Sequence, residues 1–149
     1  MTAIISLLVA AGAFVADYKT KEYATSLYAQ GKPRSFFKGH IRIGYARNEG
    51  FILNKFDKRH KLVLAVSAAV FLMLATVYAF VLHKPAHKAL RISMGLLTGG
   101  AAGNVYDRWR RGYVTDFIHA SFLKKIVFNL ADVFIVTGGL VSAFIYMLT

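Results

Sequence analysis

Four stretches of the chain are almost free of charged side chains, and together they make up about half of the sequence. They are residues 2–16, 62–82, 92–106 and 126–149. The second holds 21 residues without a charge, and the fourth holds 24 residues with one charge, that of Asp132. A helix needs about 20 apolar residues to cross a bilayer. The pattern therefore predicts a small membrane protein with several crossings and argues against a soluble globular enzyme.

The same pattern predicts helices over residues 3–28, 62–82, 89–106 and 126–148 of one membrane-embedded domain, 1–149. The first helix extends beyond its apolar half because no helix breaker precedes Gly31 and Pro33. Between the first two helices, His40 to Tyr45 alternates polar and apolar residues, as a half-exposed strand does. Residues 32–60 are thus expected outside the membrane, with residues 51–56 as an apolar cap or as a loop that rests on lipid.

Composition narrows the class of protein further. The chain has no cysteine, which excludes disulfides, thiolate nucleophiles and cysteine metal sites. Its 19 Lys and Arg residues against 7 Asp and Glu give a formal charge of +12. In a membrane protein this excess indicates contact with anionic lipid headgroups. No basic or aromatic motif stands apart from the membrane segments, so phospholipid and not nucleic acid is the expected partner.

The basic residues also bear on orientation. Eleven lie between Lys19 and Lys61, 3 between Lys84 and Arg91, and 5 between Arg108 and Lys125. Because cytoplasmic loops are enriched in Lys and Arg, this distribution places the first and third loops in the cytoplasm. Four crossings put both termini on one side of the membrane.

Acidic residues inside or next to apolar segments are candidate functional groups, because a charge at the centre of a membrane helix costs about 2.5 kcal/mol or more. Four of the seven acids are placed in this way: Asp17, Asp107, Asp116 and Asp132. Asn129 lies three residues before Asp132, on the same helix face. The third helix ends on the side where the fourth begins, so Asp116 and Asp132 can face each other at one membrane surface. A buried polar clasp between helices is the alternative for Asp132.

Two carboxyl groups in one poorly solvated site cannot both ionise easily, so the pKa of one rises. One then serves as acid while the other serves as base on a water molecule, as in aspartic proteases, without metal or cofactor. Serine-hydrolase and His-Glu-x-x-His motifs are absent, and His83 and His87 flank Pro85 in a charged turn with no third ligand. The rival interpretation is a non-enzymatic carrier that uses the two aspartates as a proton or cation relay.

Glycines recur at every fourth position in the third predicted helix, as Gly95, Gly99 and Gly103. The run from Gly99 to Gly103 lacks the Gly-Lys-Ser/Thr ending of a phosphate-binding loop. Small residues at this spacing allow membrane helices to pack closely. The stripe is therefore predicted to be a helix-packing surface.

Two longer motifs follow one another in the second half of the chain. Residues 99–117 contain Gly-Gly-x-x-Gly-Asn-x-x-Asp-Arg and then Gly-x-Val-x-Asp-Phe, and residues 128–132 read Phe-Asn-Leu-Ala-Asp. Asp-x-x-x-Lys at residues 17–21 and Asn-x-Gly at residues 48–50 precede them. In this order and spacing, they resemble the motifs of the lipoprotein signal peptidases (signal peptidase II), a family of bacterial membrane aspartic proteases. The resemblance covers nearly the whole chain.

The resemblance implies that Asp116 and Asp132 are the catalytic pair. The other polar residues of the motifs would bind substrate or support the pair: Asn48, Asn104, Arg108, Asn129, Asp17, Lys21 and Asp107. The fold it implies is an all-α membrane protein, with four transmembrane helices and a small extramembrane β-cradle between the first two helices.

The implied function is removal of signal peptides from diacylglyceryl-modified prolipoproteins, with cleavage before the lipidated cysteine. The enzyme would be a monomer without cofactor or metal, crossing the bacterial cytoplasmic membrane several times, with its active site at the outer surface. This orientation opposes the charge count, so the outer basic residues would contact lipid phosphates. Two segments depart from the family: Phe-Ile-Leu-Asn replaces Ala-Ala-Phe-Ser at residues 51–54, and Lys124 and Lys125 make the stretch before Asn129 basic. A divergent paralogue with an altered substrate is the alternative.

Overall fold

The computed structural model describes residues 1–31, 34–50, 60–83, 86–123 and 126–148. The helices in these ranges are α1 (Thr2–Ala29), α2 (His60–His83), α3 (Lys88–Arg111) and α4 (Leu130–Leu148). The strands are β1 (Arg34–Phe36), β2 (Ile41–Asn48), β3 (Val114–Ala120) and β4 (Val127–Phe128), with a short 3-10 helix at Phe37–Gly39. The predicted cap at residues 51–56 and the Lys124–Lys125 pair lie outside the described residues.

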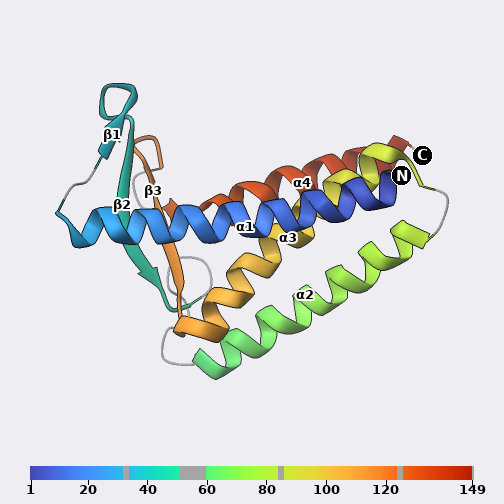
Figure 1. Ribbon diagram of the computed structural model, residues 1–149, viewed down its shortest axis with the longest axis horizontal. Coiled ribbons are helices and arrows are strands. Elements are labelled where there is room, and N and C mark those ends of the chain that lie inside the picture. Colours follow the sequence, from blue (N-terminus) through green and yellow to red (C-terminus); the bar gives the residue numbers. More distant parts are fainter. Residues whose placement is uncertain (32–33, 51–59, 84–85, 124–125, 149) are drawn as a thin grey trace.

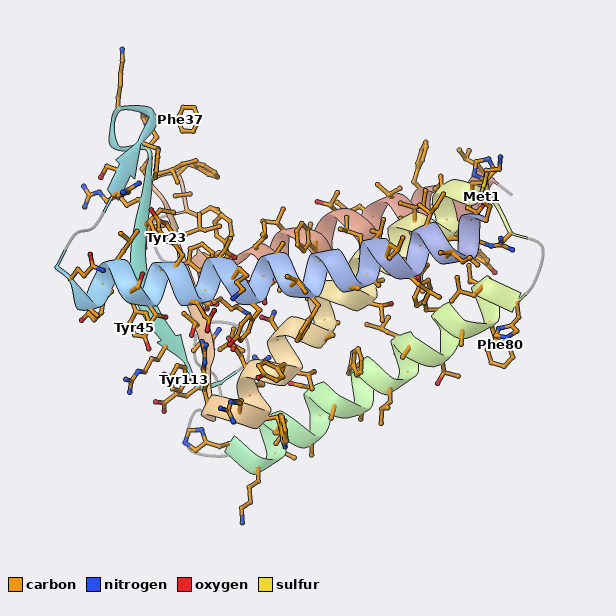
Figure 2. The ribbon with its side chains drawn as sticks, in the orientation of Figure 1. Met1, Tyr23, Phe37, Tyr45, Phe80 and Tyr113 are labelled. Carbon is orange, nitrogen blue, oxygen red and sulfur yellow. The ribbon has the colours of Figure 1, made fainter. Side chains whose placement is uncertain are left out.

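Three of the described helices, α1, α2 and α4, are long and apolar enough to cross a membrane. Apolar side chains on their outer surfaces are exposed, as for Leu72 and Phe80 on α2 and Leu140 on α4. In Figure 2, the labelled Phe80 points away from the other helices. Water would penalise such surfaces and lipid does not. The molecule is thus a mostly helical membrane protein.

Helix α3 lies at the centre and packs against each of the other helices. Its glycine stripe faces α1: a β-carbon at Gly95, Gly99 or Gly103 would meet Ser6, Ala10 or Asp17 respectively. The prediction that this stripe is a packing surface is confirmed. Close approach here brings the polar last turns of α3 against Asp17 of α1.

The strands form one antiparallel sheet in the order β1-β2-β3-β4. Ile43 pairs with Ile118 and Ala46 with Asp116, with a bulge between Ile43 and Ala46. The cradle therefore combines β1 and β2, which precede α2, with β3 and β4, which follow α3. The expected all-α class, with a cradle built only between the first two helices, needs this correction. Val114, Thr115 and Ile118 are β-branched residues that favour a strand.

Two predicted helix bounds also differ from the structure. Helix α3 continues to Arg111, where Gly112 adopts the left-handed conformation that ends many helices. Helix α4 begins at Leu130 and not at residue 126, because Val127 and Phe128 pair with β3. The apolar run from residue 126 is thus divided between a strand and a helix.

The sheet lies at one end of the helices, beside the C-terminal turns of α1 and the N-terminal turns of α2 and α4 (Figure 1). Both chain termini lie at the opposite end, where α2 ends and α3 begins. Figure 2 shows Phe37 and Met1 at these two ends. Polar residues of α1, α3 and α4 meet the sheet at the end of the molecule away from the chain termini.

Candidate active site

Asp116 lies on β3 with its side chain turned toward the helices, and only 4% of the residue is exposed. One carboxyl oxygen, Oδ1, accepts a hydrogen bond of 2.7 Å from Nδ2 of Asn129. The other, Oδ2, accepts one of 3.1 Å from Nδ2 of Asn48. Asn48 reaches it from β2, because Asn48 pairs with Val114, which lies on the same face of β3 as Asp116.

Asp132 occupies the first turn of α4, and a capping box holds it there. The backbone N–H of Asp132 donates to Oδ1 of Asn129 at 3.0 Å, and the backbone N–H of Asn129 donates to Oδ2 of Asp132 at 3.1 Å. Such reciprocal bonds satisfy two backbone donors at the start of a helix. The other oxygen of Asp132 accepts a bond of 2.9 Å from Nδ2 of Asn104 on α3. The start of α4 therefore fixes the direction of this carboxyl group.

Asn129 connects the two carboxyl groups. It is fully buried, and its side-chain N–H groups donate to Asp116 and to Oδ1 of Asn104, at 2.7 and 3.2 Å. Its backbone N–H donates to Asp132. One asparagine thus binds both acids, and Asp116 and Asp132 lie close enough for the charge of one to act on the other.

Lys21 of α1 supports the two acids through its contact with Asn104. Its ammonium group, with 1% of the side chain exposed, lies 2.7 Å from Oδ2 of Asp17, 3.3 Å from Oδ2 of Asp107 and 3.0 Å from Oδ1 of Asn104. The ammonium group thus lies between two carboxylates and donates a hydrogen bond to Asn104. Lys21 therefore holds Asn104, which in turn binds Asp132.

Asp17 also reaches the start of α4, where its Oδ1 accepts a bond of 2.9 Å from the backbone N–H of Ala131. Its carboxylate lies at the N-terminal end of that helix, the position that the helix dipole favours for negative charge. Asp17 thus connects Lys21 to the helix that carries Asp132.

Asp107 binds the backbone of β3 at Thr115, the residue before Asp116. Its Oδ2 accepts a bond of 3.1 Å from the N–H of Thr115, and its Oδ1 lies 3.5 Å from Arg111. Arg111 also donates to the hydroxyl of Thr115 at 3.0 Å. Sequence reasoning did not single out Arg111 or Thr115. The spacing of four residues between Asp107 and Arg111 is a signal that could have identified this pair.

Arg108 projects from α3 toward the segment that follows β2. It donates to the backbone oxygen of Gly50 at 3.0 Å, and its Nε is buried without a hydrogen-bond partner among the residues that the structure describes. Its charge acts on Asp116 and Asp132. Arg108 thus adds a positive charge beside the two acids and holds the residue just before the predicted cap.

Burial raises the pKa of Asp116, and the negative charge of Asp132 raises it further, to about 6. The hydrogen bonds from Asn48 and Asn129 act in the opposite direction and are outweighed. This direction agrees with the expectation for two acids in one poorly solvated site. The four carboxyl groups of the cluster face three cationic side chains, Lys21, Arg108 and Arg111. One proton on the pair would therefore leave the cluster neutral.

The structure brings all nine residues that the sequence singled out into this one cluster. They come from α1, β2, α3, β3, α4 and the residue directly before α4: Asp17, Lys21, Asn48, Asn104, Asp107, Arg108, Asp116, Asn129 and Asp132. Within the described ranges, no group of three histidine or acidic side chains is arranged to hold a metal ion. The geometry is that of a paired-carboxylate site, which can perform acid and base chemistry on a water molecule.

Comparisons with known proteins agree with this class of site. The family model described as signal peptidase (SPase) II matches residues 9–149. A lipoprotein signal peptidase of Caldicellulosiruptor bescii is 31% identical over 134 residues, covering 90% of this chain and 85% of that protein. One from Clostridium novyi is 30% identical over 132 residues, covering 87% and 88%.

Two solved structures of bacterial membrane enzymes share the fold. One has a TM-score of 0.78 at 20% identity and covers 96% of this chain and 87% of its own. The other has a TM-score of 0.76 at 22% identity and covers 94% and 90%. On the evidence of the family model and these relatives, the chain belongs to the signal peptidase II family, whose members are membrane proteases of the aspartic type.

Proposed function

We propose that this protein removes signal peptides from diacylglyceryl-modified bacterial prolipoproteins and cuts before the lipidated cysteine. The observation that carries the proposal is the pair of carboxyl groups, Asp116 and Asp132, bound by the same buried asparagine. Family membership supports the reaction, and the names of the relatives supply the substrate class.

In this proposal Asp116 and Asp132 are the catalytic residues, and one proton is shared between them. The ionised carboxylate takes a proton from water, whose oxygen attacks the carbonyl carbon of the scissile peptide bond. The protonated carboxyl group gives its proton to the carbonyl oxygen. The seven other residues of the cluster position the pair or the substrate. This chemistry needs neither a metal ion nor a cofactor.

We propose that α3 is a fourth membrane crossing within a single peptidase domain. With 24 residues it is about 36 Å long, enough to span the hydrocarbon core. Its polar residues Asn104 and Asp107 are buried against α1, β3 and α4 and so do not face lipid. All nine cluster residues come from one chain, which supports an active monomer.

We further propose that the site lies at the outer surface of the cytoplasmic membrane, where the lipidated cysteine of the substrate emerges. Aromatic residues gather near this end of the helices: Tyr106 contacts both Tyr18 and Trp109, with ring centroids 5.9 and 6.0 Å apart. Tyrosine and tryptophan favour the membrane interface. The basic residues on this side would then contact lipid phosphates.

The test is cleavage of a purified diacylglyceryl-modified prolipoprotein by the purified protein, with the unmodified precursor as control. We expect a shortened product from the modified precursor, at an unchanged rate in EDTA. Proton or cation transport into vesicles without cleavage would instead support the carrier. Two acids bound to one asparagine do not form a relay through the depth of a bilayer, which argues against that alternative.

A further inference from the structure

The two oxygens of the Asp116 carboxyl group have partners of different kinds. Oδ1 faces Nδ2 of Asn129, whose amide orientation is locked: its own oxygen accepts from the backbone N–H of Asp132, and its nitrogen also donates to Asn104. A half-turn of this amide would break all of these bonds. Asn129 therefore always presents an N–H to Oδ1, and a proton on Oδ1 would have no acceptor there.

Oδ2 faces Asn48, whose amide is not locked. Nδ2 of Asn48 donates to Oδ2 at 3.1 Å, while Oδ1 of Asn48 is buried and has no hydrogen-bond partner among the described residues. A buried carbonyl oxygen without a partner has lost its hydrogen bonds to water without compensation, which destabilises this orientation of the amide. A half-turn of the terminal amide exchanges its nitrogen and oxygen at little cost, because this torsion is broad. After the half-turn, the side-chain oxygen of Asn48 can accept a hydrogen bond from a protonated Oδ2.

Asp132 has no comparable acceptor. One oxygen accepts from Nδ2 of Asn104, and the other accepts from the backbone N–H of Asn129. The amide of Asn104 is locked as well, because its oxygen accepts from Lys21 and from Asn129. Both partners of Asp132 are therefore fixed donors, which favour its ionised form.

We propose that Asn48 is a positioning residue whose amide turns with the protonation of Asp116, and that it fixes the proton of the pair on Oδ2 of Asp116. Asp116 is then the acid and Asp132 the base. The other charged groups around Asp116 are Asp132, Lys21 and Arg108. Lys21 and Arg108 are cations that have donors and no acceptor. Both oxygens of Asp132 already accept from fixed donors, so neither replaces Asn48 as the acceptor. The assignment of Asp116 as acid and Asp132 as base rests on the proposed function. The turn of the Asn48 amide rests on the hydrogen bonds alone.

The reaction follows with all protons accounted for. Asp132 takes a proton from water as the water oxygen bonds to the carbonyl carbon, and Asp116 gives its Oδ2 proton to the carbonyl oxygen. Asn48 then turns and donates Nδ2–H to the new Asp116 carboxylate. When the intermediate breaks down, Asp132 protonates the leaving nitrogen, a hydroxyl proton returns to Asp116, and Asn48 turns back.

The test uses side-chain signals of asparagine in the resting protein, without substrate. The chain has four asparagines, so selective labelling with carbon-13 and nitrogen-15 gives a simple spectrum, and Asn48→Leu assigns the Asn48 signals. We expect the Asn48 side-chain carbonyl to shift between pH 8 and pH 5, together with the loss of the Asp116 charge. In Asp116→Asn, whose side-chain N–H imitates the protonated acid, this carbonyl should keep the low-pH position at every pH.

An Asn48 carbonyl signal that does not move while Asp116 titrates would overturn the proposal. So would an infrared band of a protonated carboxylic acid that survives in Asp116→Asn and disappears in Asp132→Asn. Because these measurements need no substrate, they can fail while cleavage is intact, and cleavage can fail while they succeed. The two proposals are thus tested separately.

Kinetics distinguish a positioning role from substrate binding. Acid and base groups typically contribute a hundredfold or more to rate. We expect Asn48→Leu to lower kcat about tenfold or more, with KM changed less than about twofold. Arg47→Leu, the neighbour whose side chain lies on the other face of β2, should leave both constants within about twofold. An increase in KM with unchanged kcat would mean that Asn48 binds the substrate and would overturn the proposal.

Discussion

At the scale of single residues, the cluster depends on charges held where water is almost absent. Lys21 is the clearest example, because its ammonium group lies between two carboxylates and donates a hydrogen bond to Asn104. The motif Asp-x-x-x-Lys predicted a supporting role for Asp17 and Lys21. Their partner on α3, Asp107, lies far along the chain, and only the motif indicated that all three would meet.

Replacement of Lys21 by Met tests this arrangement. Removing one partner of a buried ion pair typically costs 3–5 kcal/mol, because the remaining charge is left without compensation. We expect about this loss in the free energy of unfolding, measured by thermal unfolding in detergent. Lys19→Met is the matched control: Lys19 pairs with Glu22 at 3.3 Å with 69% of its side chain exposed, so its loss should change little. Equal effects of the two variants would contradict the claim that the buried ion pairs of Lys21 stabilise the fold.

Asp116→Asn has a predicted effect on stability that depends on pH. The pKa of Asp116 is raised to about 6 from an ordinary value of 3.8, so the folded state binds this proton more tightly than the unfolded state. This carboxyl group therefore favours folding below pH 4 and loses that contribution as pH rises through 6. The asparagine side chain of the variant does not ionise, so the variant does not lose stability in this way as pH rises.

The stability of Asp116→Asn relative to the natural chain should thus increase between pH 4 and pH 7, by up to about 3 kcal/mol. Thermal unfolding of both proteins across this range provides the measurement. A difference in stability that stays constant with pH would show that Asp116 is not held with a raised pKa.

At the scale of helices and strands, hydrophobic patterning predicted the helices well because each is a long apolar or small-residue run. It failed for β3, which is mostly buried, and for β4, which has only two residues. Neither strand carries the alternation of polar and apolar residues that marks a half-exposed strand. The start of α4 shows the same limit. Apolar residues stand on both sides of Asn129, at 126–128 and 130–131, and only the capping box of Asn129 and Asp132 marks the first turn.

Two adjacent glycines of α4 make a matched pair for testing helix packing. A β-carbon at Gly138 would lie 2.7 Å from backbone atoms of Ser93 and Leu97 on α3, whereas nothing lies within 4 Å of one at Gly139. Gly138→Ala should therefore lower the melting temperature, because a helix backbone cannot move aside cheaply. Gly139→Ala should leave it unchanged or raise it, since alanine favours a helix by about 1 kcal/mol over glycine. The reverse order would exclude the close packing of α3 and α4.

At the scale of the whole molecule, the motifs predicted the residues of the candidate site better than any periodicity did. All nine meet, although they come from five elements of the chain and from Asn129, directly before α4. Their convergence depends on long-range packing of α1, α3 and α4 and on the pairing of β2 with β3. Residue patterns within one element carry no information about such contacts, so the arrangement of the bonds around Asn129 could not be predicted.

Orientation is testable because the chain has no cysteine of its own. Ser35→Cys introduces an exposed thiol at the sheet end, and Lys88→Cys introduces one at the end that holds both termini. We expect a membrane-impermeant maleimide to label the first variant in intact cells and the second only after the membrane is opened. The opposite pattern would mean that the excess of basic residues, and not the site of lipoprotein processing, determines the topology.

The most direct test of the central claim is cleavage of the diacylglyceryl-modified prolipoprotein by purified Asp116→Asn and Asp132→Asn variants. Each variant should lose at least about a hundredfold in kcat, because each removes one half of the acid and base pair. Their thermal unfolding should show that both are folded. Near-normal turnover by either folded variant would contradict the assignment of Asp116 and Asp132 as the catalytic pair.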